Sequence, residues 1–229
     1  MTPSSRQVPV CIETGSKRVF ASALDWPGWS RSGRDEAAAL QTLFEYGPRY
    51  ARVLRSTGLG FTPPSSVAAL KVEEHLKGSA TTDFGSPGAF PKVDAKPITP
   101  ADVEHFAVLL HACWKTFDAI VRKAQGRELR KGPRGGGRNL ETMVRHIYEA
   151  DGAYLGGLGW KPIGPPTGRA SEELQRMRLG ILDGLTASLH GDIPARGPRG
   201  GVRWTARRFV RRVAWHVLDH AWEIEDRLA

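Results

Sequence analysis

The sequence predicts an α+β protein in which a small sheet-and-helix module precedes a mostly helical bundle. Short β-prone runs near the start are followed by one amphipathic helical stretch. After residue 99, four longer stretches each repeat apolar residues at the helical period. Amphipathic helices of this length bury their apolar stripes best against one another. We therefore expect one domain over residues 1–98 and a four-helix bundle over residues 99–229.

The first module opens with two β-prone runs, residues 8–12 and 18–23, which a Gly-Ser turn separates. A helix is predicted from Arg34, with apolar residues at helical spacing up to Tyr50. The stretch from 56 to 98 is rich in Gly, Ser, Thr and Pro and is interpreted as the end of this domain plus a linker. Within it, residues 67–72 suit another strand of the sheet and residues 81–88 suit a loop.

Part of this module resembles the HicB-like antitoxin domain. The matching pieces are Leu24-Asp25-Trp26-Pro27-Gly28-Trp29, Gly33 and the helix start Asp35-Glu36-Ala37. The resemblance implies a small sheet packed on a helix. No ribbon-helix-helix or helix-turn-helix segment is evident beside the motif. The sequence therefore shows no DNA-binding segment for a repressor role. We interpret the module as a scaffold or a partner-binding surface.

Helix start signals divide the second region into four helices. Thr99 supplies a cap, Pro100 stands at the first helical position, and an acidic residue follows at the third. Asn139 is the predicted cap of a second helix, and Ser171 begins a third with two glutamates after it. Thr205 or a close neighbour begins the fourth, which runs almost to residue 229.

The formal net charge of +9 raises the question of nucleic-acid binding. The excess is concentrated in two arginine-rich clusters, at 127–138 and 196–212. No aromatic ladder or zinc-finger spacing accompanies them. A solvated basic face or the binding of a small anion therefore explains the charge better than nucleic acid does.

Three further features bear on compartment. The sequence has no apolar run long enough to span a membrane, and its first residues lack the apolar core of a signal peptide. Cys11 and Cys113 are far apart and show no paired spacing. We expect a cytoplasmic protein with no membrane association and no disulfide framework.

Two histidines one helical turn apart, His216 and His220, form the main candidate site. Residues at i and i+4 lie on one face of a helix, so their imidazoles can share a divalent metal. His146 on the second bundle helix is the third candidate ligand, with His111 as its substitute. Glu223 is expected to accept a hydrogen bond from an imidazole N–H or to add an oxygen ligand, and Asp219 is a lesser candidate for that role, with Glu149 and Asp151.

This half of the chain resembles the DinB superfamily of four-helix bundles. The resemblance lies in His146 with Glu149 and Asp151 on the second helix, and in His216-x-x-x-His220 on the last. It implies a metal triad of His146, His216 and His220. Three imidazoles with an open position are typical of catalytic zinc, but imidazole accepts other divalent metals as well. We therefore expect a divalent cation, with zinc or nickel foremost.

An imperfect repeat precedes the second and fourth bundle helices, at residues 132–138 and 197–203. Glycine-rich backbone and arginines together can hold a carboxylate or phosphate. The candidate anion-binding residues are Arg134, Arg138, Arg199 and Arg203. The other interpretation is two flexible connectors with solubilising charge. Side chains that would form an apolar wall beside a small-molecule substrate are Tyr154, Trp160 and Trp215.

Two classes of function follow. The DinB resemblance implies a metal-dependent transferase or hydrolase, since several relatives use low-molecular-weight thiols as transferases or isomerases. Peptide hydrolysis is disfavoured, because Val217 stands where a His-Glu-x-x-His motif has its glutamate. The alternative is a non-catalytic regulatory or interaction protein, in which the HicB-like module binds a partner and the bundle is a dimerising scaffold.

Overall fold

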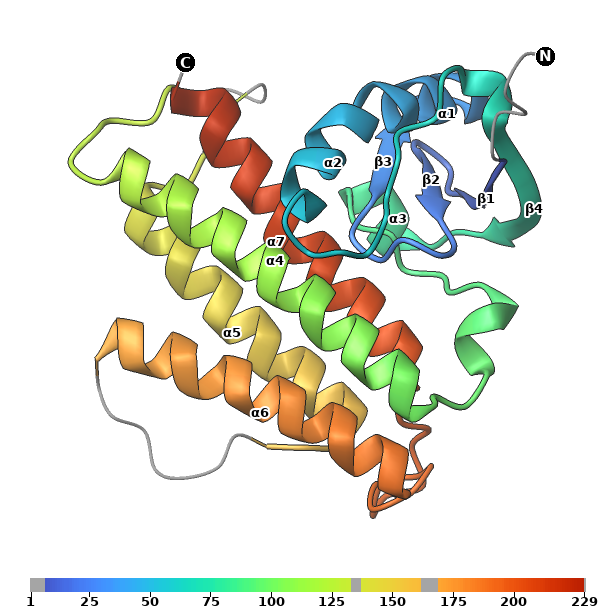
Figure 1. Cartoon of the computed structure of the whole chain (residues 1–229), viewed down its shortest axis with the longest axis vertical. Coiled ribbons are helices and arrows are strands. Elements are labelled where there is room, and N and C mark those ends of the chain that lie inside the picture. Colours follow the sequence, from blue (N-terminus) through green and yellow to red (C-terminus); the bar gives the residue numbers. More distant parts are fainter. Residues whose placement is uncertain (1–6, 133–136, 162–168, 229) are drawn as a thin grey trace. The chain divides into compact units, whose positions relative to one another are not determined.

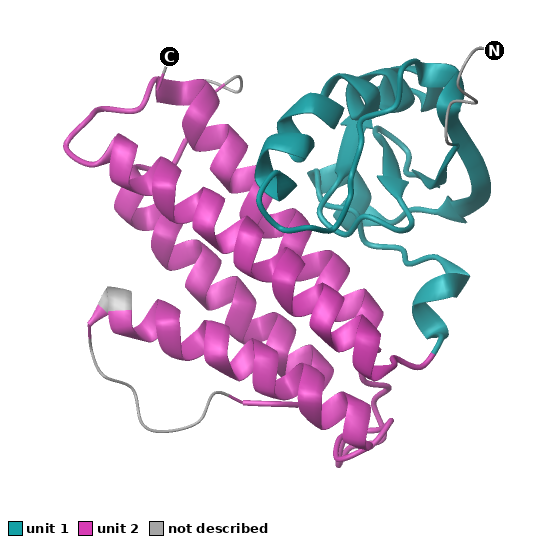
Figure 2. Cartoon of the chain, in the orientation of Figure 1, with its two compact units in different colours: residues 1–96 teal, residues 97–229 magenta. Residues whose placement is uncertain are grey.

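A computed structural model describes residues 7–132, 137–161 and 169–228. The chain divides into two compact units, Met1–Lys96 and Pro97–Ala229 (Figure 2). The first contains a mixed sheet with helices, and the second contains four long helices (Figure 1). The α+β class predicted from the sequence is confirmed.

Unit 1 is built on a four-stranded sheet in the order β3-β2-β1-β4. Strand β1 runs antiparallel to β2 and parallel to β4, and β2 runs antiparallel to β3. The strands are β1 (Val8–Thr14), β2 (Val19–Ala23), β3 (Ser30–Gly33) and β4 (Leu70–Lys77). The helices are α1 (Glu36–Glu45), α2 (Gly47–Leu54) and α3 (Ala80–Phe84), with 3₁₀ turns at Val67–Ala69 and Lys92–Ala95.

Two short elements of unit 1 differ from the sequence expectation. Strand β3 was not expected, because Ser30-Arg31-Ser32-Gly33 has little β propensity and its pairing is supplied by β2. Helix α3 occupies the predicted loop at 81–88. Its start is capped by Ser79, whose hydroxyl accepts from the Thr81 backbone N–H, and it ends at Gly85 with φ of 113°.

Gly33 marks a close approach between β3 and α1. A Cβ at this position would overlap backbone atoms of Ala38 and Ala39. We expect Gly33→Ala to weaken unit 1 by about 1–3 kcal/mol, because the strand must move away from the helix. Faster hydrogen exchange of the β2 and β3 amides in the full chain would report this loss. Ser32→Ala on the same strand is the control, and equal exchange in the two variants would contradict the prediction.

Unit 2 begins with α4 (Pro100–Ala124), followed by α5 (Leu140–Leu158), α6 (Ala170–His190) and α7 (Ala206–Leu228). The caps predicted at Thr99 and Asn139 are present, whereas α6 begins at Ala170, one residue before the predicted start at Ser171. The Thr99 hydroxyl accepts from the Asp102 N–H at 3.2 Å, and the Asn139 side chain accepts from the Thr142 N–H at 2.8 Å. Gly159 and Gly191 end α5 and α6 in the left-handed conformation.

The four long helices pack in a ring in which α4 contacts α7, α7 contacts α5, α5 contacts α6, and α6 contacts α4 (Figure 1). Their apolar stripes meet in one core, whose fully buried members include Phe117, Ile147, Leu155, Ile181, Leu185, Phe209, Val213 and Leu218. Helices α5 and α7 are therefore neighbours although they are distant in sequence. Among the described residues, no helix combines the length and apolar character needed to cross a membrane.

Candidate metal centre

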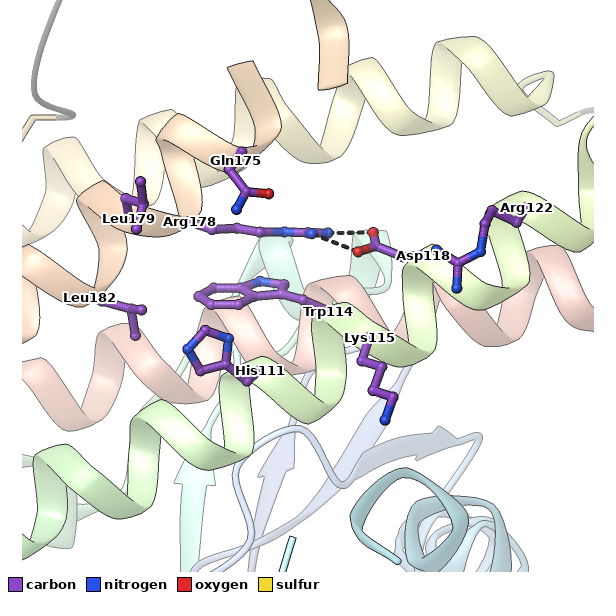
Figure 3. Close-up of a pocket in the computed structure, with 9 residues that line it drawn as sticks. All are labelled: His111, Trp114, Lys115, Asp118, Arg122, Gln175, Arg178, Leu179 and Leu182. Atoms are coloured by element: carbon purple, nitrogen blue, oxygen red, sulfur yellow. Dashed lines mark hydrogen bonds and ion pairs between the residues drawn. The ribbon is translucent and has the colours of Figure 1, made fainter. Parts of the chain in front are cut away.

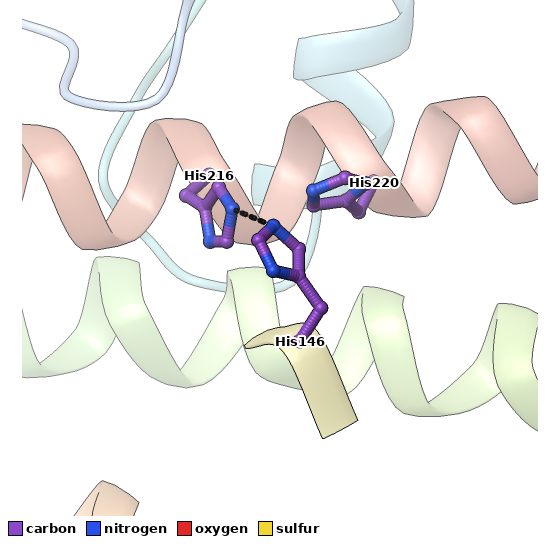
Figure 4. A group of neighbouring side chains, drawn as sticks. All are labelled: His146, His216 and His220. Atoms are coloured by element: carbon purple, nitrogen blue, oxygen red, sulfur yellow. Dashed lines mark hydrogen bonds between the residues drawn. The ribbon is translucent and has the colours of Figure 1, made fainter. Parts of the chain in front are cut away.

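His146 from α5 lies against His216 and His220 from α7 (Figure 4). One ring nitrogen of each histidine lies within 4.8 Å of the other two. The Nε2 atoms of His146 and His216 are 3.3 Å apart, and the three rings meet edge to face. His216 and His220 are buried, whereas His146 is half-buried. The three side chains thus converge on one point with a partly open side at His146.

The carboxylate of Glu223, on α7 like His216 and His220, orients the His220 ring. The Glu223 Oε2 atom lies 3.0 Å from Nδ1 of His220, so Nδ1 donates and Nε2 is left as the lone-pair nitrogen. The other oxygen of Glu223 accepts from Nη1 of Arg227 at 3.1 Å. Arg227 is itself held by the carbonyls of Arg130 and Arg138. A carboxylate that accepts a hydrogen bond from a metal-binding imidazole fixes the tautomer of that imidazole and raises its basicity.

The electrostatics of the cluster favour uncharged imidazoles. Burial lowers the pKa of His216 well below its usual value, and the neighbouring His220 and His146 lower it further. Burial also lowers the pKa of His146, with a contribution from the charge of Arg138. The hydrogen bond from His220 lowers the pKa of Glu223, which keeps that carboxylate ionised. Neutral histidine is the form that binds metal.

The donor set fits a divalent cation. Two nitrogens bound to one tetrahedral zinc stand about 3.3–3.4 Å apart, given bond lengths of about 2.0–2.1 Å. The observed 3.3 Å between His146 and His216 matches this spacing. The buried Nδ1 atom of His216 has no hydrogen-bond partner in residues 7–132, 137–161 and 169–228, so this ring nitrogen is left unsatisfied by them. Three imidazole nitrogens on two neighbouring helices can hold a cation and leave further positions open.

The acidic residues considered from the sequence occupy different environments. Glu223 contacts the triad through His220, as described above. Asp219 is half-buried on α7. Glu149 is exposed and faces Arg145 at 3.9 Å. Asp151 is fully buried on α5, and neither of its carboxylate oxygens has a hydrogen-bond partner within the part of the chain that the structure describes.

Three of the four arginines considered as anion-binding residues lie within the described part of the chain. Arg134 lies outside the described residues. Arg199 is exposed, and Arg203 lies against Gly159 and donates to the carbonyl of Pro194 at 3.4 Å. Arg138 lies close enough to the triad for its charge to lower the pKa of both His146 and His216.

Sequence reasoning missed Arg212, which stands one turn before His216 on α7. Its guanidinium lies 5.4 Å from the ring centre of Tyr154 and 5.3 Å from that of Trp215. The Tyr154 ring in turn contacts the ring of His216 at 5.5 Å. The signal was present in the sequence, because 212, 216 and 220 share one helical face.

A separate groove of about 230 Å³ lies between α4 and α6 (Figure 3). Arg178 crosses it, bonded to both carboxylate oxygens of Asp118 and placed over the Trp114 ring. His111, the substitute ligand proposed from the sequence, lies here with its ring edge-on to Trp114 at 5.4 Å. It does not belong to the histidine triad.

Comparison with known proteins found no match among family models, curated proteins or solved structures.

Proposed function

We propose that unit 2 is a DinB-like metal-binding bundle in which His146, His216 and His220 hold a divalent cation. The convergence of three imidazole nitrogens within 4.8 Å of one another is the observation that carries this proposal. Zinc or nickel suits the all-nitrogen donor set best, because imidazole is a preferred ligand of both. Glu223 supports the site by accepting from His220.

We further propose that the centre serves a metal-dependent reaction on a small molecule, such as transfer of a thiol group. A divalent cation in such a site lowers the pKa of a bound water or thiol, which supplies a nucleophile at neutral pH. The chain's own residues have three tasks. The triad fixes the reacting centre, Glu223 and Arg227 keep the His220 ring in place, and the half-buried side of His146 leaves access for a substrate.

Metal content of protein purified without an affinity tag tests the first part of the proposal. We expect about one equivalent of zinc or nickel per chain by elemental analysis, consistent with a single three-histidine site. The double variant His216→Ala/His220→Ala should lose it, because a single remaining imidazole cannot hold the ion. His190→Ala, an exposed histidine at the end of α6, is the matched control and should retain the metal.

Each outcome decides between the two classes of function. If the double variant loses the metal while its circular dichroism is unchanged, this result supports the three-histidine metal centre. If the protein transfers a thiol to an electrophile such as chlorodinitrobenzene, and this activity is lost together with the metal, the result supports an enzymatic function. Wild-type protein that is fully folded and takes up neither metal in calorimetric titration would overturn the proposal. The bundle would then be better described as the scaffold of a regulatory protein.

A further inference from the structure

The last turn of α7 is tied to the chain that connects α4 with α5. The Arg130 N–H donates to the carbonyl of Arg227 at 3.0 Å, and Nη2 of Arg130 donates to the carbonyl of Asp226 at 2.8 Å. In return, Nε of Arg227 donates to the carbonyl of Arg130 at 2.7 Å. Figure 1 shows this end of α7 beside the segment that leaves α4. The two segments therefore hold each other in both directions.

Arg227 also contacts the connection where it enters α5. Nη1 of Arg227 donates to the carbonyl of Arg138 at 3.0 Å. A Cβ at Gly137 would lie 2.7 Å from Nη2 of Arg227, so the backbone here approaches the guanidinium closely. The Arg227 side chain is 7% exposed, and hydrogen bonds from a buried cation are stronger than those between neutral groups. One side chain thus holds the backbone near both ends of the α4–α5 connection.

The same guanidinium is linked to the histidine triad through one carboxylate. Nη1 of Arg227 lies 3.1 Å from Oε1 of Glu223, and Oε2 of Glu223 lies 3.0 Å from Nδ1 of His220. Because each carboxylate oxygen has one of these partners, the orientation of Glu223 depends on both of them. A displacement of Arg227 would therefore change how the His220 ring is presented to an ion.

We propose that the α4–α5 connection controls the metal affinity of the triad through Arg227. The carbonyls of Arg130 and Arg138 fix the guanidinium, the guanidinium fixes Glu223, and Glu223 fixes the His220 ring. Such coupling is reciprocal, so a bound ion also holds the connection against α7. Arg227 is a positioning residue that acts on the ion only through other groups. The proposal rests on the metal-binding function above and extends it to the regulation of that site.

Zinc affinity of full-chain variants, measured by competition with a chromophoric chelator, tests the forward effect. Arg227→Gln should bind zinc roughly 10-fold more weakly than wild type, at the lower end of the range for groups that support metal ligands. Arg227→Lys should lie between the two, because it keeps the charge but not the planar fork that reaches all three acceptors. Arg122→Gln, an exposed arginine on α4, is the control and should bind zinc as wild type does.

A substitution in the connection itself tests the same effect without altering Arg227. Gly137 has φ of 144°, and a methyl group there would collide with the guanidinium. Gly137→Ala should therefore displace Arg227 and weaken zinc binding in the same direction as Arg227→Gln. Circular dichroism shows whether each variant is folded, and Gly137→Ala and Arg227→Lys decide the question if Arg227→Gln is not.

A double-mutant cycle separates positioning from a general structural role. If Arg227 acts through the carboxylate, Glu223→Gln/Arg227→Gln should bind zinc no more weakly than Glu223→Gln alone. If Arg227 only stabilises the bundle, its loss should add in full to that of Glu223→Gln.

Hydrogen exchange of the Arg130 amide, which donates to the carbonyl of Arg227, measures the reverse effect. Saturating zinc should slow this exchange in wild type but not in Glu223→Gln, where the link to His220 is weakened. The Arg127 amide is the internal control, because it lies in the same connection but donates to the carbonyl of Ala124 at 3.0 Å. Its exchange should not respond to zinc.

The outcomes distinguish this proposal from the metal centre itself. Zinc affinity of folded Arg227→Gln equal to that of wild type, or additive losses in the double-mutant cycle, would overturn the proposal while the metal centre stands. Equal effects of zinc on the Arg130 and Arg127 amides would overturn the reciprocal coupling. Wild-type protein that binds neither zinc nor nickel would overturn the metal centre and this proposal with it.

Discussion

Removal of the metal from the loaded protein should lower the melting temperature of unit 2 by about 12–16 °C. An ion present at about 1,000 times its dissociation constant stabilises the folded state by about 4 kcal/mol. In a helical unit of this size, each kcal/mol shifts the midpoint by about 3–4 °C. The effect is large because the ligands come from two helices, α5 and α7, so the ion binds only the folded bundle.

Differential scanning calorimetry of the zinc-loaded protein, before and after dialysis against a chelator, measures this shift. His190→Ala should show the same dependence on zinc as wild type. His216→Ala/His220→Ala should melt at one temperature in both conditions, because its remaining histidine cannot bind the ion. A zinc-dependent shift of equal size in the double variant would show that the metal acts elsewhere in the chain.

Replacing Asp151 by leucine should stabilise the protein at neutral pH by several kcal/mol. Asp151 is 1% exposed, and among the described residues neither of its carboxylate oxygens has a hydrogen-bond partner. Burial raises its pKa from an ordinary value of 3.8 to about 8. Each unit of pKa corresponds to about 1.4 kcal/mol, so holding this group in the core at pH 7 costs on the order of 4 kcal/mol. An apolar side chain of similar size avoids that cost.

The same pKa shift determines how stability depends on pH. Between about pH 4 and pH 8 the folded chain keeps the proton of Asp151, whereas the unfolded chain has lost it. The unfolded state therefore binds fewer protons, and this group's contribution to stability falls as pH rises through that window. It levels off above about pH 8. Asp151→Leu should remove this dependence, so its advantage over wild type should grow from pH 5 to pH 8.

Urea denaturation at pH 5, 6, 7 and 8 measures the difference between the two proteins. Asp192→Asn, an exposed aspartate just after α6, is the control and should track wild type at every pH. An advantage of Asp151→Leu that stays constant with pH would show that the carboxyl is ionised throughout. Zinc stoichiometry should be unchanged, because Asp151 is not among the residues that hold the cation.

The parts of the structure that could be predicted are those that local pattern determines. Thr99 and Asn139 begin helices through side-chain caps that are visible in the sequence. His216 and His220 share a face because they are four residues apart on a helix that packing stabilises. His146 was a candidate ligand from the sequence and the DinB resemblance strengthened it, but helical periodicity alone could not show that it reaches the pair. In the structure it is half-buried and reaches the pair.

The parts that could not be predicted depend on which helices become neighbours. Helices α5 and α7 pack together although α6 intervenes in the chain, and this contact brings Tyr154 between His216 and Arg212. Nothing in the local sequence of Tyr154 indicates either partner. Similarly, β3 exists because β2 pairs with it, and its own residues carry almost no strand signal.

The separation of 70 positions between His146 and His216 has a kinetic consequence. The two imidazoles meet only where α5 is docked against α7. If that docking follows the transition state for folding, ion binding adds interactions that the transition state lacks, so bound metal should slow the opening of the bundle and leave its rate of formation nearly unchanged. The lifetime of the folded state, rather than the speed of reaching it, is what such a centre would control.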